Sequence, residues 1–138
     1  MAAETFAPQA PVFARQLRWR SLRGFARLGA GRLARSAMHG AFAGAALIGF
    51  SRAFVGRFGE VSDLWIDRAW RNRGIGRRLL KTAETWLRRR GTRTARLYTP
   101  RFNGGAIRLY RACGWRVELR NRHRSLHVGR VRMCKRLR

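Results

Sequence analysis

The strongest hydrophobic pattern in the chain lies in residues 75–90, where apolar side chains recur at helical spacing. This apolar stripe consists of Ile75, Leu79, Ala83, Trp86 and Leu87. Residues 88–90 are arginines in the last turn, where cations suit the helix dipole, and Gly91 follows as the expected residue beyond the end. The pattern predicts an amphipathic helix over residues 75–90, with an i,i+4 pair between Glu84 and Arg88.

Strand-like apolar runs lie on both sides of this helix. They cover residues 45–54, 58–67, 93–99, 115–119 and 126–133, and two glycines near residues 40–44 suggest a hairpin that leads into the first run. In residues 58–67, regular alternation places Glu60, Leu64 and Ile66 on one face of the strand. Asp63 and Trp65 would then lie on the opposite face.

A second helix is expected over residues 104–113, with Asn103 as its N-cap and Gly114 at its end. The elements read strand–strand–strand–helix–strand–helix–strand–strand, which predicts an α/β (α+β) domain on a mixed sheet over residues 37–138. In residues 1–36 glycines interrupt the apolar positions, and residues 12–38 hold seven arginines and no acid. We expect this basic, divergent N-terminal segment to form two short helices.

Composition limits the function classes. The chain has 138 residues and is 46% hydrophobic, which suits the core of one domain and not a disordered basic tail. Its formal net charge of +26, mostly from arginine, attracts nucleic acid, anionic lipid and phosphorylated metabolites and repels polycations. The longest uncharged apolar run, residues 41–50, is too short to span a membrane, and residues 1–11 lack a signal-peptide pattern. We therefore expect a cytoplasmic protein without a membrane span.

The cysteines and histidines suggest neither a disulfide framework nor a metal site. Cys113 and Cys134 sit among ordinary core residues and are expected to be small buried side chains. His39, His123 and His127 are scattered along the chain, and we assign them no role as ligands.

The turn before the first helix is the candidate binding feature. It reads Arg71-x-x-Gly74-x-Gly76, and its glycines let an anionic ligand approach the backbone closely. The helix start that follows offers unpaired N–H groups and a partial positive charge, the arrangement that holds a phosphate or pyrophosphate. The arginines around it, Arg71, Arg73, Arg77 and Arg78, add charge.

Three segments together resemble the GNAT family of N-acetyltransferases. They are DLWIDRAWRNRGIGRRLL, AETWLRRRG and NGGAIRLYRACGW, in the family's order and spacing. The last follows the pattern N-x-x-A-x-x-L-Y-x-x-x-G-[aromatic]. The resemblance covers roughly residues 44–137 and is far more specific than a lone glycine turn. It implies a mostly antiparallel central sheet flanked by helices, of the acyl-CoA N-acyltransferase type, with acetyl-CoA as co-substrate and no metal.

The resemblance also implies roles for individual residues. The cofactor pyrophosphate would lie on the backbone of Asn72, Arg73, Gly74, Ile75, Gly76 and Arg77, beside Arg71. The pantetheine arm would pair like an extra strand with Leu64, Trp65 and Ile66, and an N–H near Ile66 would hold the thioester oxygen. Asn103 would contact the cofactor.

Tyr110 would donate a proton to the departing thiolate. A tyrosine on the inner face of the helix brings a hydroxyl donor that phenylalanine lacks. The other interpretation is a core tyrosine whose hydroxyl reaches the backbone. The acceptor amine must lose a proton before it attacks, and Glu60 is the first candidate base because alternation places it with Leu64 and Ile66. Asp63 is the second candidate, and either acid could instead pair with an arginine.

Two features depart from the family pattern. The branch that acetylates ribosomal-protein N-termini carries a carboxylate five residues before the motif asparagine, where this chain has Tyr98. The usual first strand and acidic first helix are not recognisable in residues 1–35, so one wall of the acceptor pocket is unaccounted for.

The leading interpretation is an N-acetyltransferase in which a primary amine attacks the thioester directly. Few acids are available, which favours a neutral or acidic amine over a polycation as acceptor. Two other interpretations stay open: a basic nucleic-acid- or ribosome-binding protein with non-specific phosphate contacts, and a cofactor-binding pseudo-enzyme. The chain also places its aromatics in core-like or motif-like positions and not interleaved on one exposed face, which counts against nucleic-acid binding; these are Trp65, Trp86, Trp115 and Phe102. The oligomeric state, including a homodimer, is left open.

Overall fold

The computed structural model describes residues 18–21, 35–120 and 129–138, and within them a seven-stranded sheet carries two α-helices. The strands are β1 (Arg18–Ser21), β2 (Ser36–Ala43), β3 (Ala46–Val55), β4 (Gly59–Ile66), β5 (Thr94–Pro100), β6 (Arg116–Arg120) and β7 (Arg130–Arg136). The α-helices are α1 (Ile75–Arg89) and α2 (Gly104–Ala112), and a 3-10 helix, η4 (Arg68–Trp70), precedes α1. Neither α-helix of this described part is long and apolar enough to cross a membrane.

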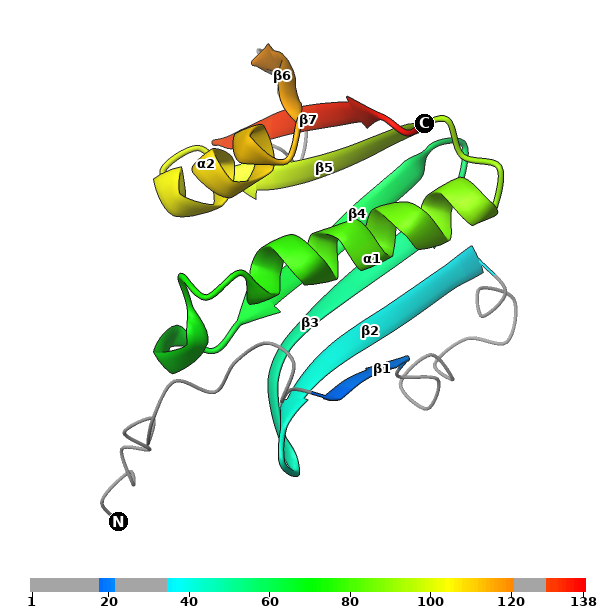
Figure 1. The fold of residues 1–138 in the computed structure, drawn as a ribbon. Coiled ribbons are helices and arrows are strands. Elements are labelled where there is room, and N and C mark those ends of the chain that lie inside the picture. Colours follow the sequence, from blue (N-terminus) through cyan, green and yellow to red (C-terminus); the bar gives the residue numbers. More distant parts are fainter. Residues whose placement is uncertain (1–17, 22–34, 121–128) are drawn as a thin grey trace.

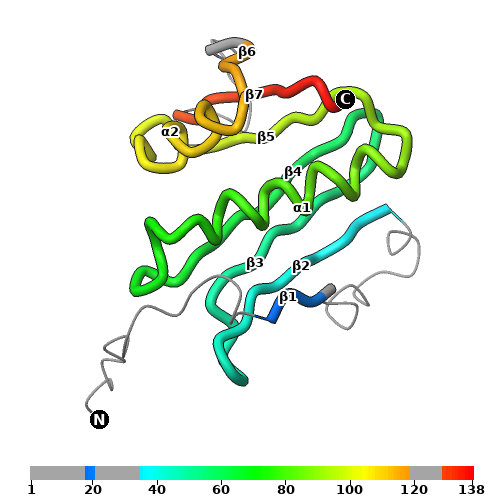
Figure 2. The backbone as a smooth tube through the Cα atoms, viewed as in Figure 1, coloured from blue at the N-terminus to red at the C-terminus, as the bar shows by residue number. Residues whose placement is uncertain are grey.

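The sheet order is β1-β2-β3-β4-β5-β7-β6, and every neighbouring pair is antiparallel except β4 with β5. This confirms the expected mixed, mostly antiparallel sheet. The parallel pair arises because α1 carries the chain from the end of β4 back to the start of β5 (Figure 2). The final residues of β4 and β5 therefore lie at the same end of the sheet, where α1 begins (Figure 1).

The prediction for the N-terminal segment is wrong where the structure describes it. Arg18–Ser21 form the edge strand β1, antiparallel to β2, and not part of a helix. Four residues reading RWRS are too short to show an alternation that would identify a strand. The rest of the predicted helical stretch, residues 22–34, lies outside the described residues. The last strand is also shifted, since β7 spans Arg130–Arg136 and residues 126–128 are not described.

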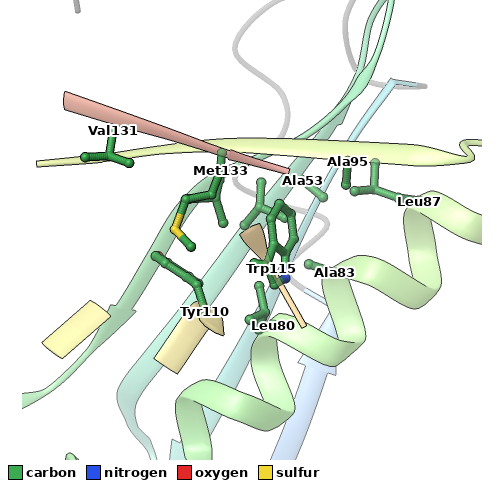
Figure 3. Packing of buried hydrophobic residues seen from close by; sticks show 11 residues of the cluster. Ala53, Leu80, Ala83, Leu87, Ala95, Tyr110, Trp115, Val131 and Met133 are labelled. Carbon is green, nitrogen blue, oxygen red and sulfur yellow. The ribbon is translucent and has the colours of Figure 1, made fainter. Parts of the chain in front are cut away.

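The apolar stripe predicted from the sequence is the buried face of α1. Ile75, Leu79, Ala83 and Leu87 are at most 2% exposed. They enter two hydrophobic clusters on the sheet face that carries α1, which we call the inner face; the opposite side is the outer face. The larger cluster joins α1 to β5, α2 and β7, and Figure 3 shows Tyr110, Trp115 and Met133 gathered over the helix residues.

A β-bulge in β4 changes the faces expected for its first half. The register between β3 and β4 shifts at Ser62, which stands in β4 without a partner residue in β3. Val61, 4% exposed in the larger cluster, therefore points to the inner face together with Leu64 and Ile66. Glu60 points to the outer face. The expectation that Glu60 shares a face with Leu64 and Ile66 is wrong, because alternation alone does not reveal a bulge.

Glu84 lies on the buried face of α1 and does not pair with Arg88. Its Oε1 accepts a hydrogen bond from Trp115 Nε1 at 3.0 Å and lies 2.7 Å from Lys135 Nζ. Lys135 also donates to the Cys113 carbonyl oxygen at 2.7 Å. This network joins α1 to β7 and to the turn between α2 and β6, whereas Arg88 bonds to the carbonyl of the last residue at 2.8 Å.

A polar pair interrupts the apolar interior. His39 in β2 and Ser51 in β3 are register partners, and His39 Nδ1 and Ser51 Oγ are buried without a hydrogen-bond partner in the described residues. Along β3, Ser51 lies between Ile48 of the smaller cluster and Ala53 of the larger one. Burial lowers the pKa of the His39 imidazole from its usual 6.5, so the ring is neutral at pH 7.

Replacing Lys135 with methionine is expected to lower the free energy of unfolding by about 1–3 kcal/mol, because the Glu84 carboxylate stays largely buried without its cation. Arg88→Met, four residues from Glu84 on the exposed side of α1, is the matched control and should change it by less than about 0.5 kcal/mol. Urea unfolding followed by circular dichroism measures both variants. Equal losses of unfolding free energy in the two variants would show that the Glu84–Lys135 pair does not stabilise the core.

Candidate functional site

Strands β4 and β5 pair only at their beginnings. Gly59 aligns with Ala95 and Glu60 with Arg96, and no further β4–β5 pair follows among the described residues. Beyond these pairs the two strands diverge toward the start of α1 (Figure 1). The edge of β4 that faces β5 therefore has no partner strand over residues 61–66, although β3 pairs with the other edge. We call this region the sheet opening.

The end of β4 directs a backbone N–H group into the sheet opening. Asp67 N–H donates to the Ile48 carbonyl oxygen of β3 at 2.8 Å. Because the backbone groups of successive residues point to opposite edges of a strand, the Ile66 N–H points away from β3, toward β5. Arg71 Nε donates to the Ile66 carbonyl oxygen at 3.1 Å, which satisfies the acceptor on that edge. The Ile66 N–H is the group that the edge offers to a ligand.

The turn after β4 presents more N–H groups at the same end. Asn72 and Gly74, the N-cap of α1, adopt left-handed backbone angles with φ of 61° and 80°. The hydrogen bond from Arg78 N–H to the Gly74 carbonyl oxygen, 3.1 Å, starts the helical ladder. The N–H groups of residues 75–77 precede this ladder and, with the helix dipole, form a site for an anion. We call residues 72–77 the phosphate cradle.

The two motif glycines are required for different reasons. Gly74 needs its left-handed φ, and a Cβ there would meet nothing within 4 Å. Gly76 has an ordinary φ, but a Cβ on it would lie 3.1 Å from Leu109 Cδ2 of α2 and 3.6 Å from Ile66 Cγ1. Gly76 therefore lets α2 pack against the start of α1. Both glycines were expected to serve the ligand, whereas the contact between Gly76 and Leu109 was not expected, because no local pattern signals it.

The arginines of the turn are mostly engaged by the protein itself. Arg71 holds the last carbonyl of β4, as described above. The Arg73 guanidinium lies 5.0 Å from the centre of a tryptophan ring in η4. Arg78 lies 4.0 Å from the centre of the Trp19 ring, a contact that joins α1 to β1. Arg77 is exposed. The phosphate cradle thus depends chiefly on backbone groups, with arginines shaping the turn.

Helix α2 carries Tyr110, which lies in the larger hydrophobic cluster, and Asn103 is its N-cap. Asn103 Oδ1 accepts from the Ala106 N–H at 3.2 Å, which confirms the predicted N-cap and leaves the amide NH₂ as the group for a ligand. Tyr110 is 7% exposed, and its ring centre lies 6.3 Å from that of Trp115 (Figure 3). Burial raises the pKa of the Tyr110 phenol above its usual 10, so the hydroxyl keeps its proton at neutral pH.

Aromatic side chains lie on the outer face beside the sheet opening. Trp65 is 41% exposed, and its ring centre lies 5.8 Å from that of Phe50 in β3. Phe50 was not among the predicted site residues, because only the strand register brings it to Trp65. Of the core-like or motif-like positions expected for the aromatics, a core-like one does not hold for Trp65 or Phe102, since Phe102 is 88% exposed. Trp115 is buried as expected.

The two candidate bases lie at different distances from the Ile66 N–H. Glu60 stands six residues earlier on β4, roughly 20 Å along an extended strand, where β4 still pairs with β5. Asp63 is three residues away, roughly 10 Å, and pairs in register with Arg52. The Ser62 hydroxyl lies 3.3 Å from Asp63 Oδ2. The structure thus brings Asp63 closer to the site than Glu60.

No group of three or more histidine, cysteine, aspartate or glutamate side chains in the described part of the chain is arranged to hold a metal ion. Cys113 and Cys134 are free thiols and only partly buried. His123 and His127 lie outside the described residues.

Known proteins share this sequence pattern and fold. The model of the acetyltransferase (GNAT) family matches residues 4–115. The solved structure of the PaiA N-acetyltransferase from Thermoplasma acidophilum in complex with coenzyme A is 27% identical, with a TM-score of 0.65, and the match covers 74% of this chain. The IAA acetyltransferase from Bacillus cereus is 17% identical with a TM-score of 0.68, over 88% of this chain and 99% of that one.

The ribosomal-protein-S18-alanine N-acetyltransferase from Escherichia coli is 22% identical with a TM-score of 0.63, over 75% of this chain and 70% of that one. The likenesses to the Bacillus and Escherichia proteins show the fold alone. This chain spans 61% of the length of the PaiA protein. No curated protein sequence matches the chain significantly.

Gly76→Val is expected to lower the free energy of unfolding by about 1–3 kcal/mol, because the added methyl groups push on Leu109. Gly105→Val is the matched control: Gly105 is the second residue of α2, as Gly76 is of α1, and a Cβ there meets only Arg108 Nη2 at 3.9 Å. The control should be neutral or slightly stabilising. Urea unfolding measures these variants and also Leu109→Ala, alone and combined with Gly76→Val. Leu109→Ala should lower the free energy of unfolding less in the Gly76→Val background than in the wild type. Additive losses would show that the two residues do not interact.

Proposed function

Because this chain belongs to the acetyltransferase (GNAT) family, we propose that it transfers an acetyl group from acetyl-CoA to a primary amine. The observation that carries the proposal is the sheet opening, with the Ile66 N–H directed into it and the phosphate cradle at the same end. The coenzyme A bound to the PaiA N-acetyltransferase supports the same ligand here.

Each part of acetyl-CoA meets a matching group. The pyrophosphate accepts hydrogen bonds from the N–H groups of residues 75–77. The pantetheine arm lies along residues 64–66 as an added strand, because that edge of β4 lacks a partner. The thioester oxygen accepts from the Ile66 N–H, which stabilises the negative charge that develops as the amine attacks. The Asn103 amide contacts the cofactor from the end of β5.

The reaction is a direct displacement. The amine nitrogen forms a C–N bond with the thioester carbon, and the C–S bond breaks. The departing thiolate takes a proton from the Tyr110 hydroxyl, and the amine loses its proton to a base. The raised pKa of Tyr110 keeps the phenol protonated until the thiolate forms. No covalent intermediate with the protein is required.

Asp63 is a better candidate for the base than Glu60. A base must reach the amine directly or through a water molecule, and Glu60 stands on the outer face where β4 and β5 are still paired. Asp63 is on the outer face as well, but it lies three residues nearer the Ile66 N–H and beyond the part of β4 that pairs with β5. Asp67, the other acid near the turn, already accepts the Ala69 N–H at 3.0 Å as the N-cap of η4.

The proposed acceptor is a neutral or acidic amine. Arg52 lies beside Asp63 in register, so a polycationic acceptor would meet repulsion as well as attraction. The exposed Trp65 ring offers an apolar surface for the acceptor body. Tyr98 in β5 stands where the ribosomal-protein branch carries a carboxylate, which disfavours a ribosomal-protein N-terminus as acceptor. A cytoplasmic location and a homodimer stay predictions.

Isothermal titration with acetyl-CoA tests the cofactor. Gly74→Glu should weaken binding at least about 100-fold, because a carboxylate enters the phosphate cradle and the left-handed φ is strained. Gly44→Glu puts the same side chain on another left-handed glycine with open surroundings and should bind normally. Tyr110→Phe should bind acetyl-CoA like the wild type but release thiol more slowly. Binding without thiol release toward any amine would favour the pseudo-enzyme, and no binding by the wild type would sink the proposal.

Asp63→Asn and Glu60→Gln separate the two candidate bases. Each substitution removes one charge and keeps the side-chain shape. With a neutral amine acceptor, Asp63→Asn should lower kcat about 100-fold, whereas Glu60→Gln should stay within about 2-fold of the wild type. The reverse pattern would return the role to Glu60.

A further inference from the structure

A second basic site lies at the end of the sheet opposite the phosphate cradle. A cavity of about 370 Å³ is lined by residues 55–59, which form the turn between β3 and β4, and by residues 90–94, which join α1 to β5. We call it the arginine pocket. Helix α1 separates it from the phosphate cradle, and its 15 residues span roughly 22 Å. The arginine pocket is therefore not part of the acetyl-CoA site proposed above.

The arginine pocket is built by close packing of its two segments. A Cβ on Gly59 would lie 2.4 Å from Thr92 Cγ2 and 3.1 Å from Leu87 Cδ2, so only glycine lets the β3–β4 turn approach the end of α1. Gly91, with φ of 81°, turns the chain there, and a Cβ on it would meet nothing within 4 Å. The segments are held together while open space remains beside Gly91.

The charge of the arginine pocket has one sign. Its lining holds Arg57, Arg90 and Arg93, and neither lining segment contains an acid. Arg88 and Arg89 belong to the adjoining last turn of α1. The negative end of the helix dipole lies close by, but a full positive charge on each of these side chains outweighs that partial charge. The arginine pocket thus attracts anions, and guanidinium groups suit phosphate oxygens in particular.

The arginine pocket also contains an exposed aromatic ring. Phe58 is 42% exposed although it is a large apolar side chain. The Arg96 guanidinium lies 3.8 Å from its ring centre and is held there by a hydrogen bond to Glu118 at 3.2 Å. The Arg57 guanidinium lies 5.7 Å from the same ring centre. The phenyl ring is thus supported by arginine and keeps an exposed part on which a flat ligand can stack.

We propose that the arginine pocket binds a nucleotide unit of single-stranded nucleic acid, with its phosphate between Arg57 and Arg93 and its base on Phe58. A simple anion would need the arginines but not the exposed ring, whereas a nucleotide uses both. The net charge of +26 favours a polyanion over a free nucleotide, because each phosphate that is neutralised releases counterions. This interaction is independent of acetyl transfer.

Fluorescence anisotropy of a labelled ten-nucleotide RNA tests the proposal at several salt concentrations. Phe58→Leu keeps the charge and removes the aromatic ring, and it should weaken binding at least about 5-fold. The double variant Arg57→Gln/Arg93→Gln should reduce the slope of log affinity against log salt concentration by the amount expected for about two phosphate contacts. Arg116→Gln, an exposed arginine outside both lining segments, is the matched control and should bind within about 2-fold of the wild type. Thermal melting checks that each variant is folded.

Competition experiments identify the ligand class and the binding site. An RNA duplex of equal length should bind more weakly than the single strand, because its bases are stacked inside it. Saturating coenzyme A should not displace the single strand, and all three variants should bind coenzyme A equally if it occupies the phosphate cradle. Displacement by coenzyme A, wild-type RNA affinity in Phe58→Leu, or a loss in Arg116→Gln as large as in the double variant would overturn the proposal. Adenosine monophosphate that binds as tightly as the RNA would assign the pocket to a free nucleotide instead.

Discussion

The structure depends on one place where the sheet leaves its own hydrogen bonds unmade. Two parallel strands, β4 and β5, pair at their beginnings and then separate, so one edge of β4 faces no strand. Backbone groups at such an edge are rarely left without partners, and here the nearby residues limit what can fill the gap. Arg71 takes the last carbonyl, α1 turns its first N–H groups to the same end, and Gly76 lets α2 approach from the side of β5. An extended ligand with an anionic group at one end and a carbonyl at the other satisfies all these groups together.

The structure also shows how so many arginines are accommodated with so few acids. Two of the acids, Glu84 and Glu118, are partly or largely buried and hold Lys135 and Arg96. Other arginines lie over aromatic rings, as Arg78 does over Trp19 and Arg90 over Trp86. Such contacts use the flat guanidinium, which is less strongly hydrated than an ammonium group. Contacts with aromatic rings therefore help to order arginine side chains in a chain that has few acids. These contacts do not neutralise the charge, so the surface stays strongly positive.

Long elements with regular periodicity could be predicted from the sequence, and positions set by contacts across the sheet could not. The helix at residues 75–89 carries a complete apolar stripe, and the cap of α2 is readable from Asn103, so both are where the sequence placed them. The edge strand β1 is too short to show alternation, and the bulge at Ser62 arises from pairing with β3. That bulge is why Glu60 was expected on the wrong face. The glycine turn was recognisable, but the tasks of Gly76 and Arg71 depend on Leu109 and Ile66, which only folding brings near.

The scarcity of lysine among so many arginines limits the number of amine groups that the protein itself carries. The chain contains two lysines, Lys81 and Lys135, among 138 residues. Lys135 Nζ pairs with the Glu84 carboxylate and donates to a backbone carbonyl oxygen, so it is held as an ammonium group and does not act as a nucleophile. Arginine keeps its charge at any physiological pH and is a poor acyl acceptor. With the activity proposed above, the protein would present hardly any amine of its own to the activated acetyl group, and its charge would persist unmodified in a cell rich in acetyl donors.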